Sequence, residues 1–305
     1  MSVRWPDSHG VNRTLLWKPD EEPGMRALCA TDLSAASEAA IENETCLDCL
    51  GRIGIGTIHL VTVVPANVHS GMPGINLDRR RQQGLDRYRD VIAAAGFEVE
   101  THVVRGTPYR RINGIAETVR ADLTVVSSRG QSPLENRIIG STARNLARTT
   151  VVPLLVSRVE READDPDVLR EHLFQRILFA TDFSEHADRA FDAFSYLHPA
   201  TEEATLVHVR SSKDAGADSG PDPRERLAEH AGTLEGWGIE TRIEVREGDP
   251  ADEILDVEAD VTPSTVVVGS KGRSRIRRLL LGSVSEEVVA RAAGNVFLVP
   301  PPRAV

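Results

Sequence analysis

The feature that most constrains the fold of this chain is an internal repeat. MRALCATDLS, residues 25–34, matches QRILFATDFS, residues 175–184, and both contain Ala-Thr-Asp followed by an apolar residue and Ser. A repeated segment of this kind indicates two copies of one structural unit. The chain has 305 residues, which is enough for two domains that each bury their own core.

Two further pairs of matching segments set the extent of the copies. RGTPYRRI begins at residue 105 and matches EGDPADEI from residue 247, and SSRGQSPLENRIIGST begins at residue 127 and matches GSKGRSRIRRLLLGSV from residue 269. We therefore predict one domain over residues 24–157 and a second over residues 173–302. The strongly charged segment 158–172 between them is predicted to be an exposed linker that is helical in part.

Each copy alternates five short apolar runs with helix-length amphipathic segments. The runs are RALCA, TIHLVTV, FEVETHVV, DLTVVS and TVVPLLV in the first copy, and RILFA, ATLVHV, ETRIEV, STVVVG and NVFLV in the second. Strands separated by helices need parallel crossover connections. The sequence therefore predicts an α/β fold in which each domain has a five-stranded parallel sheet with helices on both faces. We expect the two domains to pair through TVVPLLV and NVFLV, because edge strands this apolar invite association.

A glycine-containing loop of the form G-x2-G-x9-G-S follows the fourth run of the second copy, at the sheet edge where ligands bind in such folds. Gly269 and Gly272 are expected to allow positive φ and close approach of backbone N–H groups to an anion. Gly282 and Ser283 open the last helix, and Ser283 with Glu286 has the spacing of a capping box. The loop also holds five basic residues, Lys271, Arg273, Arg275, Arg277 and Arg278. We interpret it as a phosphate site; the alternative is turn glycines beside a solvated basic face.

The composition argues against several classes of partner. A net charge of −10 and an aromatic fraction of 4% disfavour a nucleic-acid surface. No apolar stretch reaches the length of a membrane span, and the N-terminal residues lack the apolar core of a signal peptide. We therefore expect a cytoplasmic protein.

The cysteines and histidines do not form a recognisable metal-ligand pattern. Cys46 and Cys49 make a CxxC towards the end of a predicted helix, which favours packing over redox or metal chemistry. The nine histidines, His59 and His208 among them, show no ligand spacing and are expected to be hydrogen-bonded core or edge residues. The glycines of GRIGIG, residues 51–56, precede a strand and predict only a helix-to-strand turn. We predict no metal site.

Three motifs together resemble the universal stress protein family: T-D-x-S after the first strand, a central G-x-P-x-x-x-I, and G-x2-G-x9-G-S before the last helix. The resemblance covers nearly the whole chain, as a tandem two-domain member. It implies a flavodoxin-like, HUP-type sheet that binds ATP or a related adenine nucleotide, and pairing of domains through their last strands. Mg²⁺ could accompany the nucleotide, bound through water at Asp182.

The resemblance also implies site residues in the second copy. Adenine and ribose would contact Ala180, Thr181 and Asp182, and Val209 would line the adenine pocket. Ribose and phosphates would be held by Val268, Gly269, Gly272, Gly282, Ser283 and Val284.

The first copy has a degenerate version of this set. The matching positions are Ala30, Thr31, Asp32, Val63, Val126, Ser127, Gly130, Gly140, Ser141 and Thr142. Ser127 stands where the second copy has Gly269, and its Cβ could obstruct the ligand or require a positive φ that Ser tolerates poorly. The first loop is also less basic, since Glu135 accompanies Arg129 and Arg137. We expect unequal sites, with the second one stronger.

The leading hypothesis is a cytoplasmic nucleotide-binding stress protein whose conformation or association depends on the nucleotide. No set of catalytic base, Walker-type lysine and metal ligand is present in the sequence, so catalysis is expected to be absent or slow. One alternative is a slow ATPase or a phosphoryl or nucleotidyl transferase, and another is an interaction module without nucleotide. The expected partners are an adenine nucleotide, the other domain, a second copy of the chain and an unidentified protein.

Overall fold

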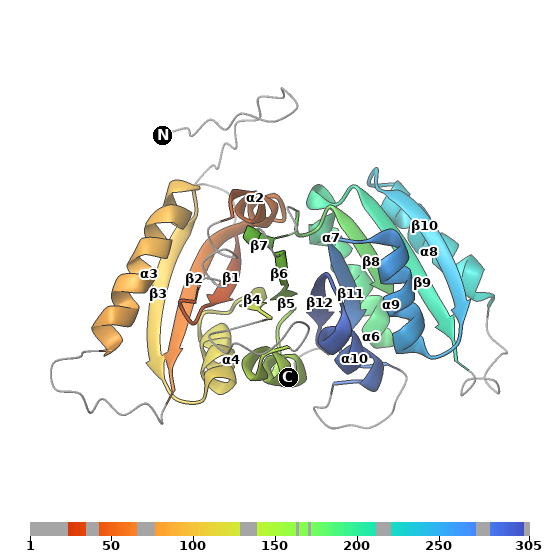
Figure 1. Cartoon of the computed structure of the whole chain (residues 1–305). Coiled ribbons are helices and arrows are strands. Elements are labelled where there is room, and N and C mark those ends of the chain that lie inside the picture. The colour runs from red at the N-terminus through yellow and green to blue at the C-terminus, as the bar shows by residue number, and fades with distance from the viewer. Residues whose placement is uncertain are drawn as a thin grey trace.

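The structure is a computed structural model that describes residues 24–34, 43–65, 77–128, 139–162, 165–169, 172–211, 221–272 and 281–301. Domain 1 forms the left half of Figure 1 and domain 2 the right half. The elements of domain 1 are β1 (Met25–Ala30), α2 (Glu44–Arg52), β2 (Ile55–Val64), α3 (Leu77–Ala94), β3 (Glu98–Arg105), α4 (Pro108–Thr118), β4 (Leu123–Ser127), α5 (Ser141–Thr149) and β5 (Leu154–Ser157).

Domain 2 repeats this order with one further short helix and a 3-10 turn. Its elements are β8 (Arg176–Ala180), α6 (Glu185–Asp192), α7 (Phe194–Leu197), η1 (His198–Ala200), β9 (Glu203–Arg210), α8 (Pro223–Glu235), β10 (Glu240–Glu247), α9 (Pro250–Val261), β11 (Thr265–Gly269), α10 (Ser283–Arg291) and β12 (Asn295–Val299). All ten predicted strands are therefore present.

Side-chain caps fix where several helices begin. Asn43, Ser184, Asp222 and Asp249 each accept a hydrogen bond from a backbone N–H in the first turn of the helix that follows. Because those N–H groups have no partner within the helix, each cap stabilises its helix by about 1 kcal/mol. Helices α4, α8 and α9 also begin with proline, whose fixed φ suits the first helical position.

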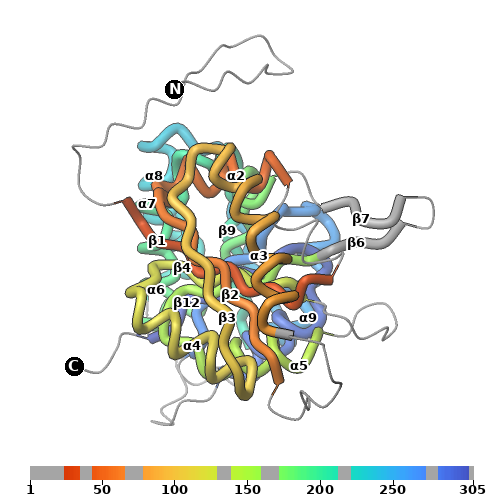
Figure 2. Tube along the Cα trace, turned by 90° about the vertical axis from the view of Figure 1, so that its left-hand side faces the viewer, coloured from red at the N-terminus to blue at the C-terminus, as the bar shows by residue number. Residues whose placement is uncertain are grey.

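The strands form one ten-stranded sheet in the order β10-β9-β8-β11-β12-β5-β4-β1-β2-β3. Within each domain the strands are parallel and follow the doubly wound order in which the first and fourth strands are neighbours. The domains join where β12 pairs antiparallel with β5, with Val296 opposite Val156 and Leu298 opposite Leu154. This confirms the predicted pairing through the last strands. Figure 2 turns the domain 1 edge of the sheet towards the viewer.

Each face of the sheet has its own hydrophobic core, and each core spans both domains. One core contains Leu47 from α2, Leu85 from α3 and Leu227 from α8. The other contains Ile112 from α4 and, from domain 2, side chains of α9 and α10. The predicted helices on both faces are therefore confirmed, and the domains share buried apolar surface beyond the strand pair.

The segment between the domains differs from the helical expectation. It contains β6 (Val159–Glu162) and β7 (Asp165–Leu169), which pair antiparallel. The expectation of helix rested on the charged residues of the segment. Val159 and Val168, however, are β-branched and Leu169 is apolar, and such residue types favour a strand. Leu173 and Phe174, directly after this segment, are buried, and Phe174 packs edge-on against Phe297 of β12 with ring centroids 6.0 Å apart.

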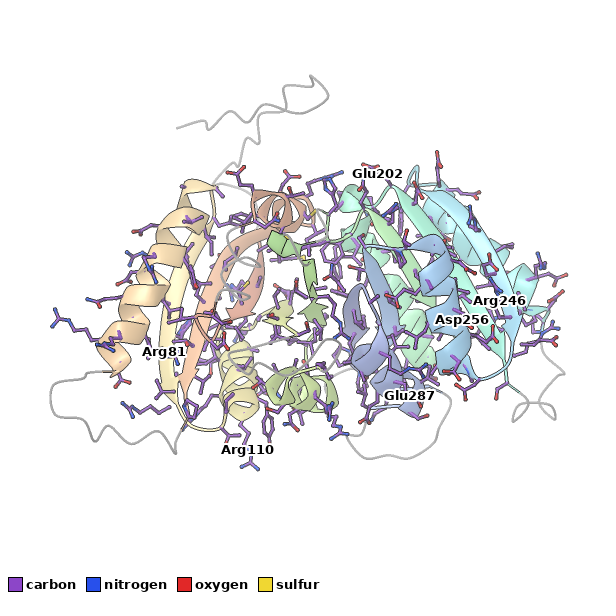
Figure 3. All side chains as sticks on the ribbon, viewed as in Figure 1. Arg81, Arg110, Glu202, Arg246, Asp256 and Glu287 are labelled. Carbon is purple, nitrogen blue, oxygen red and sulfur yellow. The ribbon has the colours of Figure 1, made fainter. Side chains whose placement is uncertain are left out.

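Charged side chains cover the outer surface of both domains, as Figure 3 shows for Arg110 of α4, Glu202 before β9 and Asp256 of α9. Among the described residues, no helix combines the length and apolar character that crossing a bilayer requires.

Candidate functional site

The structure brings the predicted residues of domain 2 to one edge of the sheet, at the carboxyl ends of the strands. Ala180 ends β8 and stands in register with Val268 of β11 and with Val207 of β9. Thr181 donates its N–H to the Val207 carbonyl at 3.0 Å, which holds the residue after β8 against β9 at this edge. Val209 lies two residues further along β9, and Gly282 begins α10 at the same edge. All ten candidates of this domain are among the described residues.

The T-D-x-S motif forms a turn that is held by its own side chains. Thr181 Oγ1 accepts the N–H of Phe183 at 2.9 Å, and Asp182 Oδ1 accepts both the N–H and the hydroxyl of Ser184, at 3.0 and 2.6 Å. Phe183 between them has φ +56°. Ser184 then caps α6, so the motif both ends a strand and starts a helix.

The carboxylate of Asp182 lies against the backbone of the glycine loop. A Cβ added to Gly272 would stand 2.6 Å from Asp182 Oδ2, closer than atoms can approach. A side chain at position 272 would therefore require the Asp182 carboxylate to move away from the loop. This contact places a hydrogen-bond acceptor next to the glycine loop that precedes α10.

The beginning of α10 differs from the predicted capping box. Gly282 is the N-cap and Ser283 is already the first helical residue, so the cap residue has no side chain that could accept a hydrogen bond. Glu286 instead pairs with Arg148 of α5 across the domain junction. The prediction was wrong by one residue, because a glycine at the cap leaves Ser283 inside the helix. Within the part of the chain that the structure describes, the first N–H groups of α10 therefore have no helical acceptor and no cap from their N-cap residue.

The reason proposed for the glycines also needs correction. Gly269, Gly272 and Gly282 do not adopt positive φ, and neither does Ser127. A Cβ on Gly269 would instead stand 2.8 Å from the His186 carbonyl oxygen of α6. Gly269 is explained by the close packing of α6 on β11, and a strained φ is no reason for Ser127 to be unfavourable.

Domain 1 reproduces most of this geometry. Thr31 Oγ1 accepts the Leu33 N–H at 2.9 Å, Asp32 Oδ1 accepts the Ser34 N–H at 3.0 Å, and Leu33 has φ +60°. The other described candidates occupy equivalent places: Val63 in β2, Val126 and Ser127 in β4, Gly140 at the N-cap of α5, and Ser141 and Thr142 in its first turn. Gly130 and the basic residues Arg129 and Arg137 lie outside the described residues, as do Arg273, Arg275, Arg277 and Arg278 of domain 2.

One residue beside the turn of domain 2, Arg226, was missed by the sequence reasoning. The Arg226 guanidinium carbon lies 4.1 Å from the centroid of the Phe183 ring. The centroids of the Phe183 and His208 rings are 4.6 Å apart. His208 Nδ1 is 2.9 Å from the Thr181 carbonyl oxygen, which confirms that it is a hydrogen-bonded core histidine. Arg226 comes from α8, far along the chain, and no local pattern marks it.

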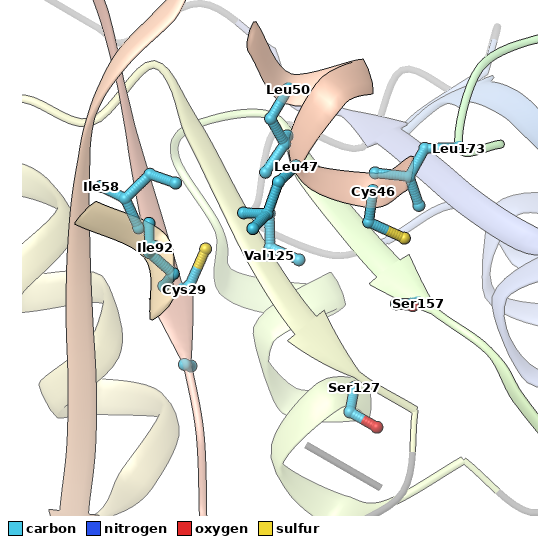
Figure 4. Close-up of a pocket in the computed structure, with 11 residues that line it drawn as sticks. Cys29, Cys46, Leu47, Leu50, Ile58, Ile92, Val125, Ser127, Ser157 and Leu173 are labelled. Atoms are coloured by element: carbon cyan, nitrogen blue, oxygen red, sulfur yellow. The ribbon is translucent and has the colours of Figure 1, made fainter. Parts of the chain in front are cut away.

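A small cavity lies beneath the site of domain 1 (Figure 4). Its volume is about 30 Å³, and Cys29, Cys46, Leu47, Val125 and Ser127 are among the residues that line it. Domain 2 has Phe179 in the place of Cys29, so the smaller side chain leaves this space. A space of this size holds about one water molecule and is too small for a nucleotide.

The cysteines are buried and unreactive. Helix α2 begins at Glu44, so Cys46 lies in its first turn, where its N–H bonds Asn43 at 3.0 Å, and the prediction that the CxxC lies towards the end of the helix was wrong. Burial nevertheless raises the pKa of the Cys46 thiol to about 12 and that of Cys29 to about 12. Both thiols stay protonated at neutral pH, which supports packing over redox chemistry.

Comparison with known proteins agrees with this fold. The sequence model of the universal stress protein family matches residues 25–158 and again residues 173–300. A universal stress protein of Mycolicibacterium smegmatis is 24% identical over 294 residues, which cover 90% of this chain and 96% of that protein. A universal stress protein of Methanocaldococcus jannaschii is 27% identical over 149 residues, which cover 44% of this chain and 86% of that protein.

Solved structures give the same result. The crystal structure of a universal stress protein from Archaeoglobus fulgidus has a TM-score of 0.70 and 25% identity, and the match covers 90% of this chain and 98% of that one. The matched family segments coincide with the two domains described above and together span most of the chain. The chain is a tandem, two-domain member of the universal stress protein family.

Proposed function

We propose that domain 2 binds ATP or another adenine nucleotide at the carboxyl edge of its sheet, and that the protein acts in stress response in the cytoplasm through nucleotide-dependent conformation or association. The observation that carries this proposal is the start of α10 at Gly282, a cap residue without a side chain, which lies beside Gly272, while Gly272 lies against the Asp182 carboxylate. Unpaired N–H groups at the positive end of a helix favour a phosphate. The family resemblance of the motifs supports adenine as the base.

The proposal assigns separate tasks to these groups. Asp182 would accept hydrogen bonds from ribose hydroxyls, while the backbone of Gly272 and the first turn of α10 would donate to phosphate oxygens. Val209 would supply apolar contact to the adenine and Val268 would lie beside the ribose, and both side chains are almost fully buried. Mg²⁺ would bind through phosphate oxygens and water at Asp182.

Gly282→Ala is the sharpest test of the phosphate contact. A Cβ on Gly282 would meet its nearest neighbour, the Lys271 Cα, at 3.5 Å, which is ordinary contact, so the variant should fold normally. The added methyl group would nevertheless point into the space between Gly272 and the helix start. We expect isothermal titration calorimetry of nucleotide-free protein to show ATP affinity weakened by about tenfold or more, equivalent to about 1.4 kcal/mol.

Gly140→Ala is the matched control in domain 1, where the first site is proposed to be weaker. It should change the tighter binding event much less, and the wild type should show one dominant site or two sites that differ by about tenfold. Equal effects of Gly140→Ala and Gly282→Ala, or two equal sites in the wild type, would contradict the proposed inequality. Failure of the wild type to bind ATP would favour an interaction module without nucleotide.

We further propose that hydrolysis is slow, below about 0.01 per second, far under typical enzyme rates. Among the described residues, the printed partners of the Asp182 carboxylate are the N–H and the hydroxyl of Ser184, and the sequence has no set of catalytic base, Walker-type lysine and metal ligand. Phosphate release measured with and without Mg²⁺ tests this. A metal-dependent rate near one per second that Asp182→Ala abolishes would identify an ATPase instead.

A further inference from the structure

Two histidines and a glutamate converge on the outer edge of domain 1, away from the nucleotide site. His59 of β2 stands opposite Glu100 of β3 in the strand register, and His102 follows on the same face two residues later. His59 Nδ1 lies 3.2 Å from His102 Nε2 and 3.4 Å from Glu100 Oε2. One ligand atom from each residue lies within 4.8 Å of the others.

These separations fit a tetrahedral metal ion. With metal–nitrogen and metal–oxygen bonds of about 2.0–2.1 Å, neighbouring ligands of a tetrahedral ion stand about 3.3 Å apart. The two measured contacts of His59 have this length, so an ion could be bound with small movements of the side chains. His59 is buried, while the Glu100 side chain is 65% exposed, which leaves an open side for a water ligand and for entry of the ion.

The repeat supplies an internal comparison. The counterparts in domain 2, set by the pairing of β9 with β10, are Thr205, Arg242 and Glu244. This set has no imidazole, and Glu244 is instead paired with Arg246 at 3.2 Å. The same backbone positions therefore fold without the two histidines and the glutamate, and the sheet does not require them.

We propose that His59, Glu100 and His102 form a binding site for a zinc-class divalent cation at the edge of domain 1. Two imidazoles and one carboxylate suit Zn²⁺, Co²⁺ or Ni²⁺, whereas Mg²⁺ and Ca²⁺ prefer oxygen ligands alone. A bound ion links the edge strand β3 to β2 and leaves its fourth position to water. Val63 at the nucleotide edge is four residues from His59 along β2, a distance of about 13 Å at 3.3 Å per residue, so the two sites are separate.

The surroundings of the site are compatible with a cation. Glu98 lies two residues before Glu100 on the same face of β3 and adds a second carboxylate. Arg26 of β1 is a positive group that acts on His59, and its guanidinium donates to the Val119 carbonyl oxygen at 3.2 Å. Desolvation by burial lowers the pKa of His59 and of His102 from 6.5, so both rings are neutral and keep a lone pair at neutral pH.

The test uses the full chain without an affinity tag, after treatment with a chelator. Calorimetric titration with Zn²⁺ should show a stoichiometry of about one and a Kd of about 1 µM or tighter. His102→Ala should weaken this binding by about 100-fold or more, since loss of even an outer-shell partner can cost that much. Glu100→Gln, at an exposed position that should not disturb folding, should weaken it by about tenfold.

Glu244→Ala, at the position in domain 2 that corresponds to His102, should leave Zn²⁺ binding unchanged. Co²⁺ provides a second readout, because four-coordinate Co²⁺ with nitrogen and oxygen ligands gives visible d–d bands, and thiolate ligation adds a near-ultraviolet charge-transfer band. A thiolate band would place the ion at Cys46 and Cys49 and overturn the proposal. So would the absence of Zn²⁺ binding at about 100 µM, or binding unchanged by both His102→Ala and Glu100→Gln.

Discussion

At the scale of single residues, the T-D-x-S turns at the carboxyl edge of the sheet contain residues with positive φ, and in domain 2 aromatic rings pack beside the turn. Leu33 and Phe183 occupy the left-handed region, which costs a residue with a Cβ about 1 kcal/mol. Neighbouring side chains compensate in each domain. In domain 1, Leu33 packs closely against Gly84 of α3, where an added Cβ would lie only 2.6 Å from the Leu33 Cδ1. In domain 2, Phe183 packs against His208 and Arg226. The position of the turn therefore depends on packing as well as on the T-D-x-S motif.

His230 links this cluster to the pH dependence of stability. Its ring lies 4.1 Å from the Phe191 ring, between centroids, and its buried Nδ1 has no hydrogen-bond partner among the described residues. Desolvation by burial lowers the His230 pKa below 6.5. The unfolded chain therefore binds a proton more readily than the folded one, so this stabilising contribution is complete above pH 6.5 and is lost as pH falls below it.

We predict that His230→Phe, which keeps an aromatic ring but removes the titrating group, reduces the loss of stability between about pH 7.5 and about pH 5.5. Urea unfolding at both pH values measures the difference. Between about pH 7.5 and about pH 8.5 the variant and the wild type should change in parallel, because the histidine is neutral in both states there. An equal loss of stability in the two proteins on acidification would show that His230 does not contribute.

At the scale of elements, the packing of α6 on β11 determines the residue at position 269. The backbone of Gly269 approaches the His186 carbonyl too closely for a side chain, and Ser285 of α10 donates its hydroxyl to the Gly269 carbonyl at 2.7 Å. One residue thus joins a strand to two helices. Domain 1 accepts Ser127 at the equivalent place, so the strand itself tolerates a Cβ.

Gly269→Ala should therefore destabilise the protein by about 1–3 kcal/mol, because α6 must move away from the sheet. Chemical denaturation measures this cost. Gly232→Ala in α8 is the control, since a Cβ there has no atom within 4 Å and alanine favours a helix over glycine by about 0.5–1 kcal/mol. Stability of Gly269→Ala equal to the wild type would mean that the close contact is not maintained in solution.

At the scale of the whole molecule, the two domains form one continuous sheet with two shared cores. Leu154, Leu155, Phe297 and Leu298, at the seam, are all fully buried. Polar contacts add to the seam, since Arg158 donates its N–H to Asn295 Oδ1 at 2.9 Å and its guanidinium to the Val289 carbonyl at 2.5 Å. The exposed pair of Arg148 with Glu286 contributes little, because such pairs are worth about 0–1 kcal/mol.

Separated domains should therefore associate. Residues 24–158 and 173–301, expressed alone, would each expose an apolar edge strand, and each should form dimers at about 100 µM. Mixing the two halves should yield the complex with restored contacts of Arg158 and Asn295. Analytical ultracentrifugation distinguishes these states. Stable monomers of both halves that do not combine on mixing would show that the seam is weaker than its burial indicates.

The sequence alone predicted the repeat, the ten strands, the pairing of the last strands and the sheet edge that holds Asp182 and Gly282. These follow from periodicity and spacing along the chain, and each copy shows the same pattern independently. The predictions of a helical linker and of a Ser283 capping box were wrong. In the linker, strand pairing prevailed over the expected helix, and at the start of α10 the glycine at position 282 is the cap instead of Ser283.

Only the tertiary structure explains why position 269 is glycine, and only it brings His59, Glu100 and His102 together. His59 and His102 are 43 residues apart, and spacing along the chain gave no sign of a common site. They meet because the register of β2 with β3 sets His59 opposite Glu100. Register depends on how whole strands align and bury their faces, so a pattern read along one strand cannot contain it.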